Sequence, residues 1–241
     1  MTYLFNLILV RPLLNLLVLG YQYIPGHNVG WAIVLLTIFV RLLLAPSMFK
    51  ALKNQRDLMV IQPKMNAIRE KHKEDKEAQA KALMELYKEH NYNPLSSCLP
   101  TLIQLPILLA LYKVFVIGLG TADLQQYLYH WVYNPGVMSP YFIFGLNLAH
   151  VSLVLGIIAG ILQYFQSWMI IQGTQRSTDP MQSAMQSQMM YVLPVVTILI
   201  SLRIPSGLPL YWIVTTLFAI AQQFYIIRGQ PKNEIVVNPI K

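Results

Sequence analysis

The sequence predicts an all-α integral membrane protein, because its composition, its apolar segments and its charge distribution all match that class. Hydrophobic residues make up 55% of the 241 residues and charged residues only 12%, against about 25% charged in soluble domains. Residues 50–90 hold ten of the 18 Lys/Arg and seven of the 10 Asp/Glu. The rest of the chain is therefore nearly uncharged and long enough to cross a bilayer several times.

Five segments are predicted to span the membrane. A bilayer core about 30 Å thick needs about 20 mainly apolar helical residues, and the segments that meet or approach this length are residues 29–48, 99–117, 148–171, 189–202 and 208–227. The fourth is short. It becomes credible as a span if its helix reaches back into the polar residues 182–188, or if it lies where the bilayer is thinned. A re-entrant segment is the alternative. Residues 203–209, Arg-Ile-Pro-Ser-Gly-Leu-Pro, are typical of a tight turn between the last two helices.

Residues 1–28 are predicted to form an amphipathic helix in the external interface. Arg11-Pro12 interrupts the apolar stretch and leaves about eleven residues for a helix with Pro in its first turn. Asn15 and Gln22 fall on one face of that helix. A signal-anchor is the alternative, and no small-residue cleavage site decides between the two.

The distribution of Lys and Arg predicts the orientation. Residues 49–98 hold ten Lys/Arg, whereas residues 118–147 hold none. By the positive-inside rule the former segment is cytoplasmic and the latter is external. Counting spans from there places the N-terminus outside, and the loop 172–188 and the tail 228–241 in the cytoplasm.

The cytoplasmic segment 49–98 is predicted to form a helical hairpin. Two sets of apolar residues recur at helical spacing on either side of the charged residues 71–77, where the chain would turn. These sets are Leu58, Ile61, Met65 and Ile68, and Ala80, Leu83, Met84 and Tyr87. Each stripe needs a partner, and the other stripe, lipid headgroups or a client protein are the alternatives.

Arg41 is the first candidate functional residue, because it lies inside the span 29–48 with apolar neighbours on both sides. A charge at membrane depth costs about 2.5–3.5 kcal/mol on insertion scales. Thr37 lies one turn earlier and shares its face. An arginine that reaches the cytoplasmic surface is the alternative, but its side chain would have to climb about 10 Å. A watery functional cavity is therefore the preferred interpretation.

Three glutamines also lie at membrane depth: Gln104 in the second span, and Gln163 and Gln166 in the third. A single glutamine in a span more often bonds a neighbouring helix than forms a site. Together with Arg41 the three could line a polar groove, but the sequence does not decide whether they face one another.

The sequence holds no arrangement typical of an enzyme. It has no phosphate-binding loop, no metal-ligand spacing among its His and Cys residues and no nucleophile beside a base, so we expect no catalysis, no metal and no cofactor. The net charge of +8 comes without a nucleic-acid-binding motif and favours a cytoplasmic face near anionic lipids over direct nucleic-acid binding. Cys98 is the only cysteine, which excludes an intramolecular disulfide.

Short motifs from residue 12 to residue 229 jointly resemble the YidC insertase family, in its order and spacing. Each motif is weak alone, and together they are highly specific. The matching residues are Gly30-Trp31, Thr37, Arg41, Pro46, Gln62-Pro63-Lys64, Tyr87, Asn93-Pro94, Cys98, Pro100, Gln104, Pro106, Leu109-Ala110-Leu111-Tyr112, Asp179-Pro180-Met181-Gln182, Pro205-Ser206-Gly207-Leu208 and Leu210-Tyr211-Trp212.

The resemblance implies a five-helix membrane core with a cytoplasmic hairpin and an external amphipathic helix. It also implies a hydrophilic groove open to the cytoplasm and to lipid, in which Arg41 is the groove arginine with Thr37 beside it. Tyr211 and Trp212 match aromatic positions of the last helix, and Gln166 matches a polar position of the third. The clients would be newly made membrane proteins, inserted without nucleotide hydrolysis.

The resemblance also bears on location and partners. No Arg/Ser-rich transit peptide precedes the core, which favours a bacterial inner membrane. Compared with Gram-negative members, we expect neither the extra N-terminal span nor the large periplasmic domain, and we expect the tail 228–241 to be shorter than the ribosome-binding extension of some relatives. The lipid bilayer is an expected partner, and a Sec translocon and a ribosome are further candidates. A small transporter or a structural scaffold is the alternative function, but no internal repeat supports a transporter and a scaffold would not need Arg41.

Overall fold

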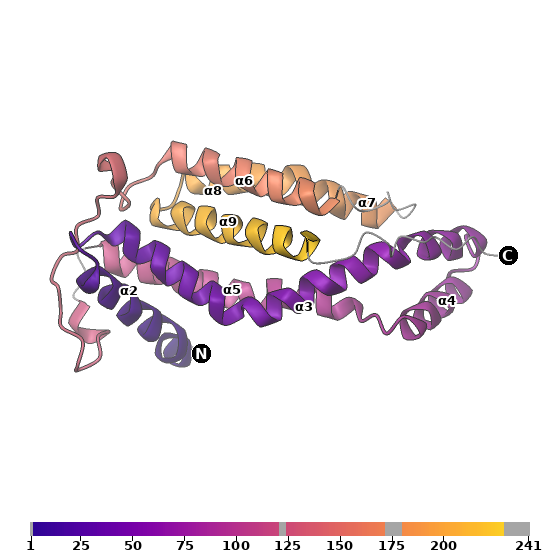
Figure 1. Cartoon of the computed structure of the whole chain (residues 1–241), viewed down its shortest axis with the longest axis horizontal. Coiled ribbons are helices and arrows are strands. Elements are labelled where there is room, and N and C mark those ends of the chain that lie inside the picture. The colour runs from indigo at the N-terminus through magenta and orange to yellow at the C-terminus, as the bar shows by residue number, and fades with distance from the viewer. Residues whose placement is uncertain (1, 121–123, 172–179, 229–241) are drawn as a thin grey trace.

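The computed structural model describes residues 2–120, 124–171 and 180–228. Every regular element within these residues is a helix (Figure 1). The central helix is α9 (Gly207–Arg228), which contacts α3 (Val29–Lys71), α5 (Pro94–Leu119) and α6 (Leu153–Ile171). Figure 1 shows α6 and α8 (Leu193–Ser201) on one side of α9, and α3 and α5 on the other.

One uninterrupted helix, α3, carries both the first predicted span and the first arm of the hairpin. It has 43 residues and contains Pro46 and Pro63, so the helix continues past residue 48, where the predicted span ends. The Asn28 side chain caps its start by accepting hydrogen bonds from the backbone N–H groups of Gly30 (3.0 Å) and Trp31 (3.2 Å). One helix with two internal prolines thus joins Arg41 to the charged hairpin.

The N-terminal segment is helical from residue 2 to residue 23, and the predicted interruption at Arg11-Pro12 is wrong. Helix α1 (Thr2–Phe5) leads through the π-helical turn η1 (Asn6–Val10) into α2 (Arg11–Tyr23). The Arg11 N–H bonds the Asn6 carbonyl across this turn, and the wider winding accommodates Pro12, which has no N–H to donate. The buried face of α2, with Leu14, Leu17 and Val18, packs into the main core.

The hairpin consists of the second half of α3 and of α4 (Lys76–Glu89). The chain turns between Lys71 and Lys76, and Asp75 caps α4 by accepting from the N–H groups of Glu77 (3.1 Å) and Ala78 (2.9 Å). The two apolar stripes pack against each other, so each stripe is the partner of the other, except that Met84 of the second stripe is 56% exposed. The buried residues of this hairpin core are Ile61, Met65, Leu86 and Tyr92.

The fourth predicted span is preceded by a helical extension. Helix α7 (Pro180–Ser187) passes through the π-helical turn η4 (Gln188–Val192) into α8, and Ser187 and Val192 at the junctions have right-handed helical dihedrals. The helical run therefore begins in the polar stretch, as a span requires. The loop 172–179 lies outside the described residues.

Helices α6 and α8 approach closely because two glycines face α8. A Cβ atom on Gly160 would lie 2.6 Å from Ile198 Cγ1, and one on Gly156 would lie 2.7 Å from Ser201 Cβ. Small residues four apart commonly permit such contacts between membrane helices. Pairing with α6 thus fixes the position of the short α8.

Four helical segments of the described chain are long and apolar enough to cross a membrane: Tyr3–Tyr23, Val29–Asn54, Leu102–Leu119 and Leu153–Ile171. A shorter apolar stretch covers Gln188–Ser201. The composition and the helices together confirm an all-α membrane protein. Helix α9 is not among these four segments, and it packs between α3 and α6.

Candidate functional site

Arg41 is buried in the bundle, with 7% of its surface exposed. Its Nε donates to the Thr215 hydroxyl of α9 at 3.4 Å, its one hydrogen bond among the described residues. None of the chain's 10 Asp and Glu residues lies in α3 before Asp57, in α5, in α6 or in α7 to α9. The membrane helices therefore offer this cation polar neutral partners and no carboxylate, which is costly for a buried charge.

Tyr211 is the second buried member of the site and is 1% exposed. The Gln104 amide of α5 donates to its hydroxyl, and Thr215 lies one helical turn further along α9 on the same face. Arg41, Thr215, Tyr211 and Gln104 thus form one polar network that joins α3, α9 and α5. Gln104 Oε1 is buried without a partner, so the network retains an unused acceptor.

Thr37 lies on the same face of α3 as Arg41 and is 1% exposed. Its hydroxyl donates to the Ile33 carbonyl at 2.6 Å, a bond within its own helix. Among the described residues, no hydrogen bond joins Thr37 to the Arg41 guanidinium.

The structure separates Gln163 from the polar network. The Thr197 hydroxyl of α8 donates to Gln163 Oε1 at 2.5 Å, so this glutamine ties α6 to α8. Gln166 is half-buried on α6, and no hydrogen bond among the described residues joins it to Arg41. Trp212 is half-buried and packs against the main core beside Tyr211.

Two polar residues of α9 escaped the sequence analysis. Thr215 contacts Arg41, and Gln222, 7% exposed, has a buried Nε2 without a partner. Tyr211, Thr215 and Gln222 are spaced by four and seven residues, which places them on one helical stripe. This spacing could have predicted a polar stripe on α9. It was missed because a single polar residue is common in a membrane helix.

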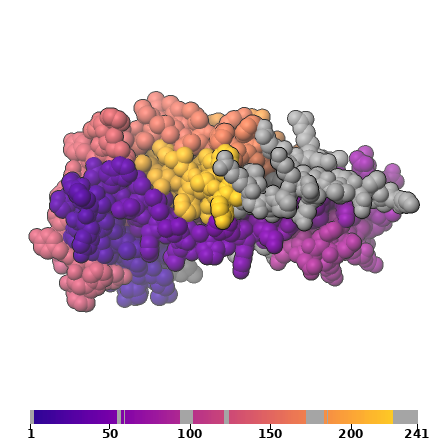
Figure 2. Space-filling view, viewed as in Figure 1, coloured from indigo at the N-terminus to yellow at the C-terminus, as the bar shows by residue number. Residues whose placement is uncertain are grey.

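The site's central helix is accessible from one side of the molecule. Figure 2 shows α9, in yellow, as a strip of surface between α6, in orange, and α3, in purple. Its outward side chains include Leu217 and Phe224, which are 49% and 45% exposed. An apolar segment in the bilayer therefore has a lateral approach to the helix that carries Tyr211 and Thr215.

Among the described residues, no group of three or more His, Cys, Asp or Glu residues is placed to hold a metal ion. The network itself contains a cation, two hydroxyls and an amide, and none of these is paired with a base. It can bind anions, water or peptide groups through hydrogen bonds.

Comparison with known proteins identifies the family. A family model described as 60Kd inner membrane protein matches residues 20–234. The membrane protein insertase YidC of Pelobacter propionicus is 38% identical over 221 residues, which cover 91% of this chain and 38% of that protein. The YidC of Geobacter metallireducens is 35% identical over 218 residues, covering 90% and 36%. The YidC of Fusobacterium nucleatum is 34% identical over 228 residues, covering 95% and 98%.

The chain spans a little over a third of the length of the first two relatives and nearly all of the third. With the apolar helices, these relatives support a multi-pass protein of the cell membrane. The prediction of a YidC-type chain is confirmed: the chain belongs to the 60Kd inner membrane protein family.

Proposed function

We propose that this protein is a membrane protein insertase that helps newly made membrane proteins enter the bilayer without nucleotide hydrolysis. The observation that carries the proposal is Arg41, a cation buried at membrane depth without a carboxylate in the surrounding helices. Burial of an arginine without a carboxylate partner at membrane depth costs free energy, so we expect this residue to have a function, namely to interact with a client protein. The relatives named membrane protein insertase support the same function.

The proposed mechanism is a reduction of the desolvation cost of a client's polar tail. A single-span client must carry a short polar segment across lipid, where unpaired polar groups are strongly disfavoured. A hydrophilic groove beside Arg41, open to the cytoplasm and to lipid, keeps that tail partly hydrated. Release follows from partition of the client's apolar helix into lipid. The membrane potential adds about 2.3 kcal/mol per charge per 100 mV.

Arg41 attracts acidic groups on the tail. Two unit charges ~4 Å apart interact by ~4 kcal/mol at an effective dielectric constant of 20, and by ~1 kcal/mol in bulk water. Thr215 positions the guanidinium through its hydroxyl. Gln104 extends the polar lining with its unused oxygen.

The remaining candidate residues have more peripheral roles in this proposal. Gln166 and Trp212 contact the client along α6 and α9. Thr37 is 1% exposed, so it contacts the client only when the helices packed against this face of α3 move apart. Gln163 is hydrogen-bonded to Thr197 in this structure. It can contact the client only when that hydrogen bond breaks.

The proposed setting is a bacterial inner membrane, with the N-terminus outside and the hairpin and C-terminal tail in the cytoplasm. The support is the ten Lys/Arg in residues 49–98 against none in residues 118–147. An impermeant maleimide should therefore label a single cysteine at Lys73, in a Cys98→Ser chain, only from the cytoplasmic side. A Sec translocon and a ribosome are further proposed partners, but the groove mechanism does not require either.

The test is insertion into proteoliposomes that contain only this protein and no nucleotide. Two clients are compared that differ only in having acidic or neutral residues in the translocated tail. Arg41→Ala should slow insertion of the acidic client about tenfold, which corresponds to about 1.4 kcal/mol, and should affect the neutral client little. Arg41→Lys should retain much of the activity because the charge remains. Arg203→Ala, which removes a charge from the exposed turn before α9, is the matched control.

Two outcomes would contradict the mechanism. The first is a stable Arg41→Ala protein that inserts the acidic client at the normal rate. The second is an equal loss for both clients together with a lower melting temperature, which would assign Arg41 to helix packing. No insertion by the unmodified protein would favour the scaffold or transporter alternatives.

A further inference from the structure

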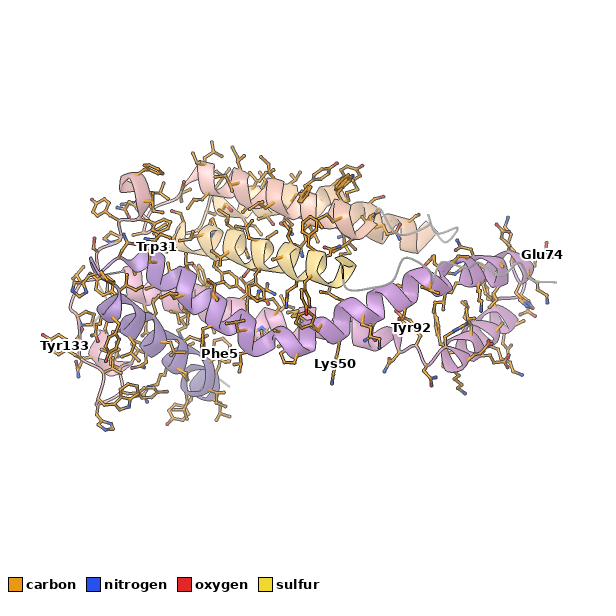
Figure 3. The ribbon with its side chains drawn as sticks, viewed as in Figure 1. Phe5, Trp31, Lys50, Glu74, Tyr92 and Tyr133 are labelled. Atoms are coloured by element: carbon orange, nitrogen blue, oxygen red, sulfur yellow. The ribbon has the colours of Figure 1, made fainter. Side chains whose placement is uncertain are left out.

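The loop between α5 and α6 presents an uncharged aromatic surface at the end of the bundle opposite the hairpin. The sequence from residue 124 to residue 175 has no Lys, Arg, Asp or Glu. Figure 3 shows Tyr133 and Trp31 at one end of the molecule and Glu74 at the other. The exposed apolar residues of this loop are Trp131 (61%), Tyr133 (79%), Val137 (78%), Tyr141 (55%), Ile143 (41%) and Phe144 (102%).

The first half of this loop is held firmly by α2. Asn15 is 2% exposed; its amide donates to the Tyr127 carbonyl at 3.1 Å and accepts from the Tyr129 N–H at 2.8 Å. Arg11 donates to the Tyr127 carbonyl at 3.3 Å and lies over the Tyr129 ring at 5.4 Å. The aromatic side chains are therefore displayed by a fixed backbone, and their exposure does not come from a loosely attached loop.

The second half ends in a tight turn with Phe144 at its tip. The Phe142 N–H bonds the Leu146 carbonyl at 2.8 Å, and Tyr141 pairs with Asn147. Phe144 has φ 58° and ψ 26°, and Gly145 has φ 73°. A turn with positive φ at both central residues favours Asn-Gly, and a bulky aromatic residue there is strained. Phe144 thus has a strained backbone conformation, and in water the full exposure of its apolar ring would be a second unfavourable contribution.

The base of this turn lies level with the start of a membrane span. The Phe142 ring packs edge-on against Trp31 with centroids 5.6 Å apart, at the beginning of Val29–Asn54. Gly30 makes room for this ring, since a Cβ there would lie 2.0 Å from Phe142 Cδ2. The exposed aromatic residues are thus placed where the apolar helices leave the bilayer core, the depth at which Trp and Tyr are enriched.

We propose that the loop 129–144 is seated in the lipid interface of the leaflet at this end of the bundle. Phe144 inserts below the headgroups, and Trp131, Tyr133 and Tyr141 lie among them with their polar groups toward water. Insertion compensates the strained turn by removing the Phe144 ring from water. The absence of charge from residue 124 to residue 175 fits a lipid interface and disfavours a soluble partner.

The anchor would fix how deep the functional site lies. Arg41 follows Trp31 by ten residues in a continuous helix, which is about 15 Å at 1.5 Å per residue. That distance is half of a bilayer core about 30 Å thick. The loop therefore holds Arg41 near the bilayer centre, and this inference stands whether or not the protein is an insertase.

The test measures where a fluorescent label on this loop resides. Single cysteines replace Phe144, Val137 or Lys73 in a Cys98→Ser chain, and each carries an environment-sensitive NBD dye. The proteins are reconstituted in phosphatidylcholine vesicles, with or without lipid that carries a headgroup-level nitroxide. Labels at Phe144 and Val137 should emit at shorter wavelength than the Lys73 label, be quenched by the nitroxide lipid and resist aqueous iodide.

Two outcomes would overturn the proposal. Iodide quenching of the Phe144 and Val137 labels equal to that of the Lys73 label would place the loop in water. Protection from both quenchers would show that protein, a second copy of the chain, covers the surface. Two label positions are used so that a local disturbance at the strained Phe144 turn does not decide the result.

Discussion

Two pairs of antiparallel helices in this molecule are held together by opposite kinds of residue. In the hairpin, α3 meets α4 and Tyr92 just after it through large apolar side chains: Ile61, Met65 and Leu86, with Tyr92. In the membrane bundle, α6 and α8 meet through Gly156 and Gly160 and through the hydrogen bond from Thr197 to Gln163. Both pairs are closely packed, and the difference lies in what surrounds them.

The surrounding solvent explains this contrast. Next to water, burial of large apolar side chains stabilises a helix pair by about 25 cal/mol per Å². In lipid that driving force between helices is absent, and close backbone approach and polar contacts take over. The exposed side chains support this explanation. The outer face of the hairpin carries charged residues, as expected next to water, whereas α6 exposes apolar residues such as Val154 and Ile161, as expected next to lipid.

The largest loss of stability is expected from Gly160→Leu, which tests whether close backbone approach holds α6 and α8 together. The new side chain would meet Ile198 and the Pro194 carbonyl, and backbone cannot move aside as a side chain can. We expect a destabilisation above about 3 kcal/mol, the upper end of ordinary overpacking, measured by melting of the purified protein. Ile158→Leu, on the exposed side of the same helix, is the matched control. An unchanged melting temperature for Gly160→Leu would show that α6 and α8 are not closely packed.

An intermediate effect is expected from Leu86→Ala in the hairpin. Leu86 is 6% exposed, and its truncation should destabilise the hairpin by about 2 kcal/mol, the lower end for such changes because the core is small. Faster hydrogen exchange in α4, with unchanged exchange in α6 and α8, would measure it. Met84→Ala, which removes a side chain that is 56% exposed, should change little. Equal effects of the two variants would indicate that the hairpin core does not form.

The smallest effect is expected from Thr197→Val, which removes one interhelical hydrogen bond and keeps the shape. Bonds of this kind in membrane proteins contribute about 0.6 kcal/mol on average and up to about 1.7. The melting temperature should therefore fall slightly, and less than in Gly160→Leu. A loss as large as that of the glycine variant would mean that the polar contact, rather than close packing, holds α8.

The local features of the chain were predictable because their causes are local. The turn of the hairpin falls between Lys71 and Lys76, inside the charged stretch that interrupts the two apolar stripes. Arg41 was recognisable as a charge at membrane depth because a single charge stands out in an apolar segment. The N-terminal helix was predicted too short, because an Arg-Pro pair usually ends a helix and a π-helical turn absorbs it in this chain.

The sequence by itself determined which segments avoid water and which residue brings a charge among them, since both follow from composition along the chain. Only the tertiary structure decided the partners of that charge. Arg41 meets Thr215 across 174 residues, and Gln104 meets Tyr211 across 107, whereas Gln163 is paired with Thr197 of α8. Hydrogen bonds act over about 3 Å. The relative register of α3, α5, α6, α8 and α9 therefore decides which polar residues form the site.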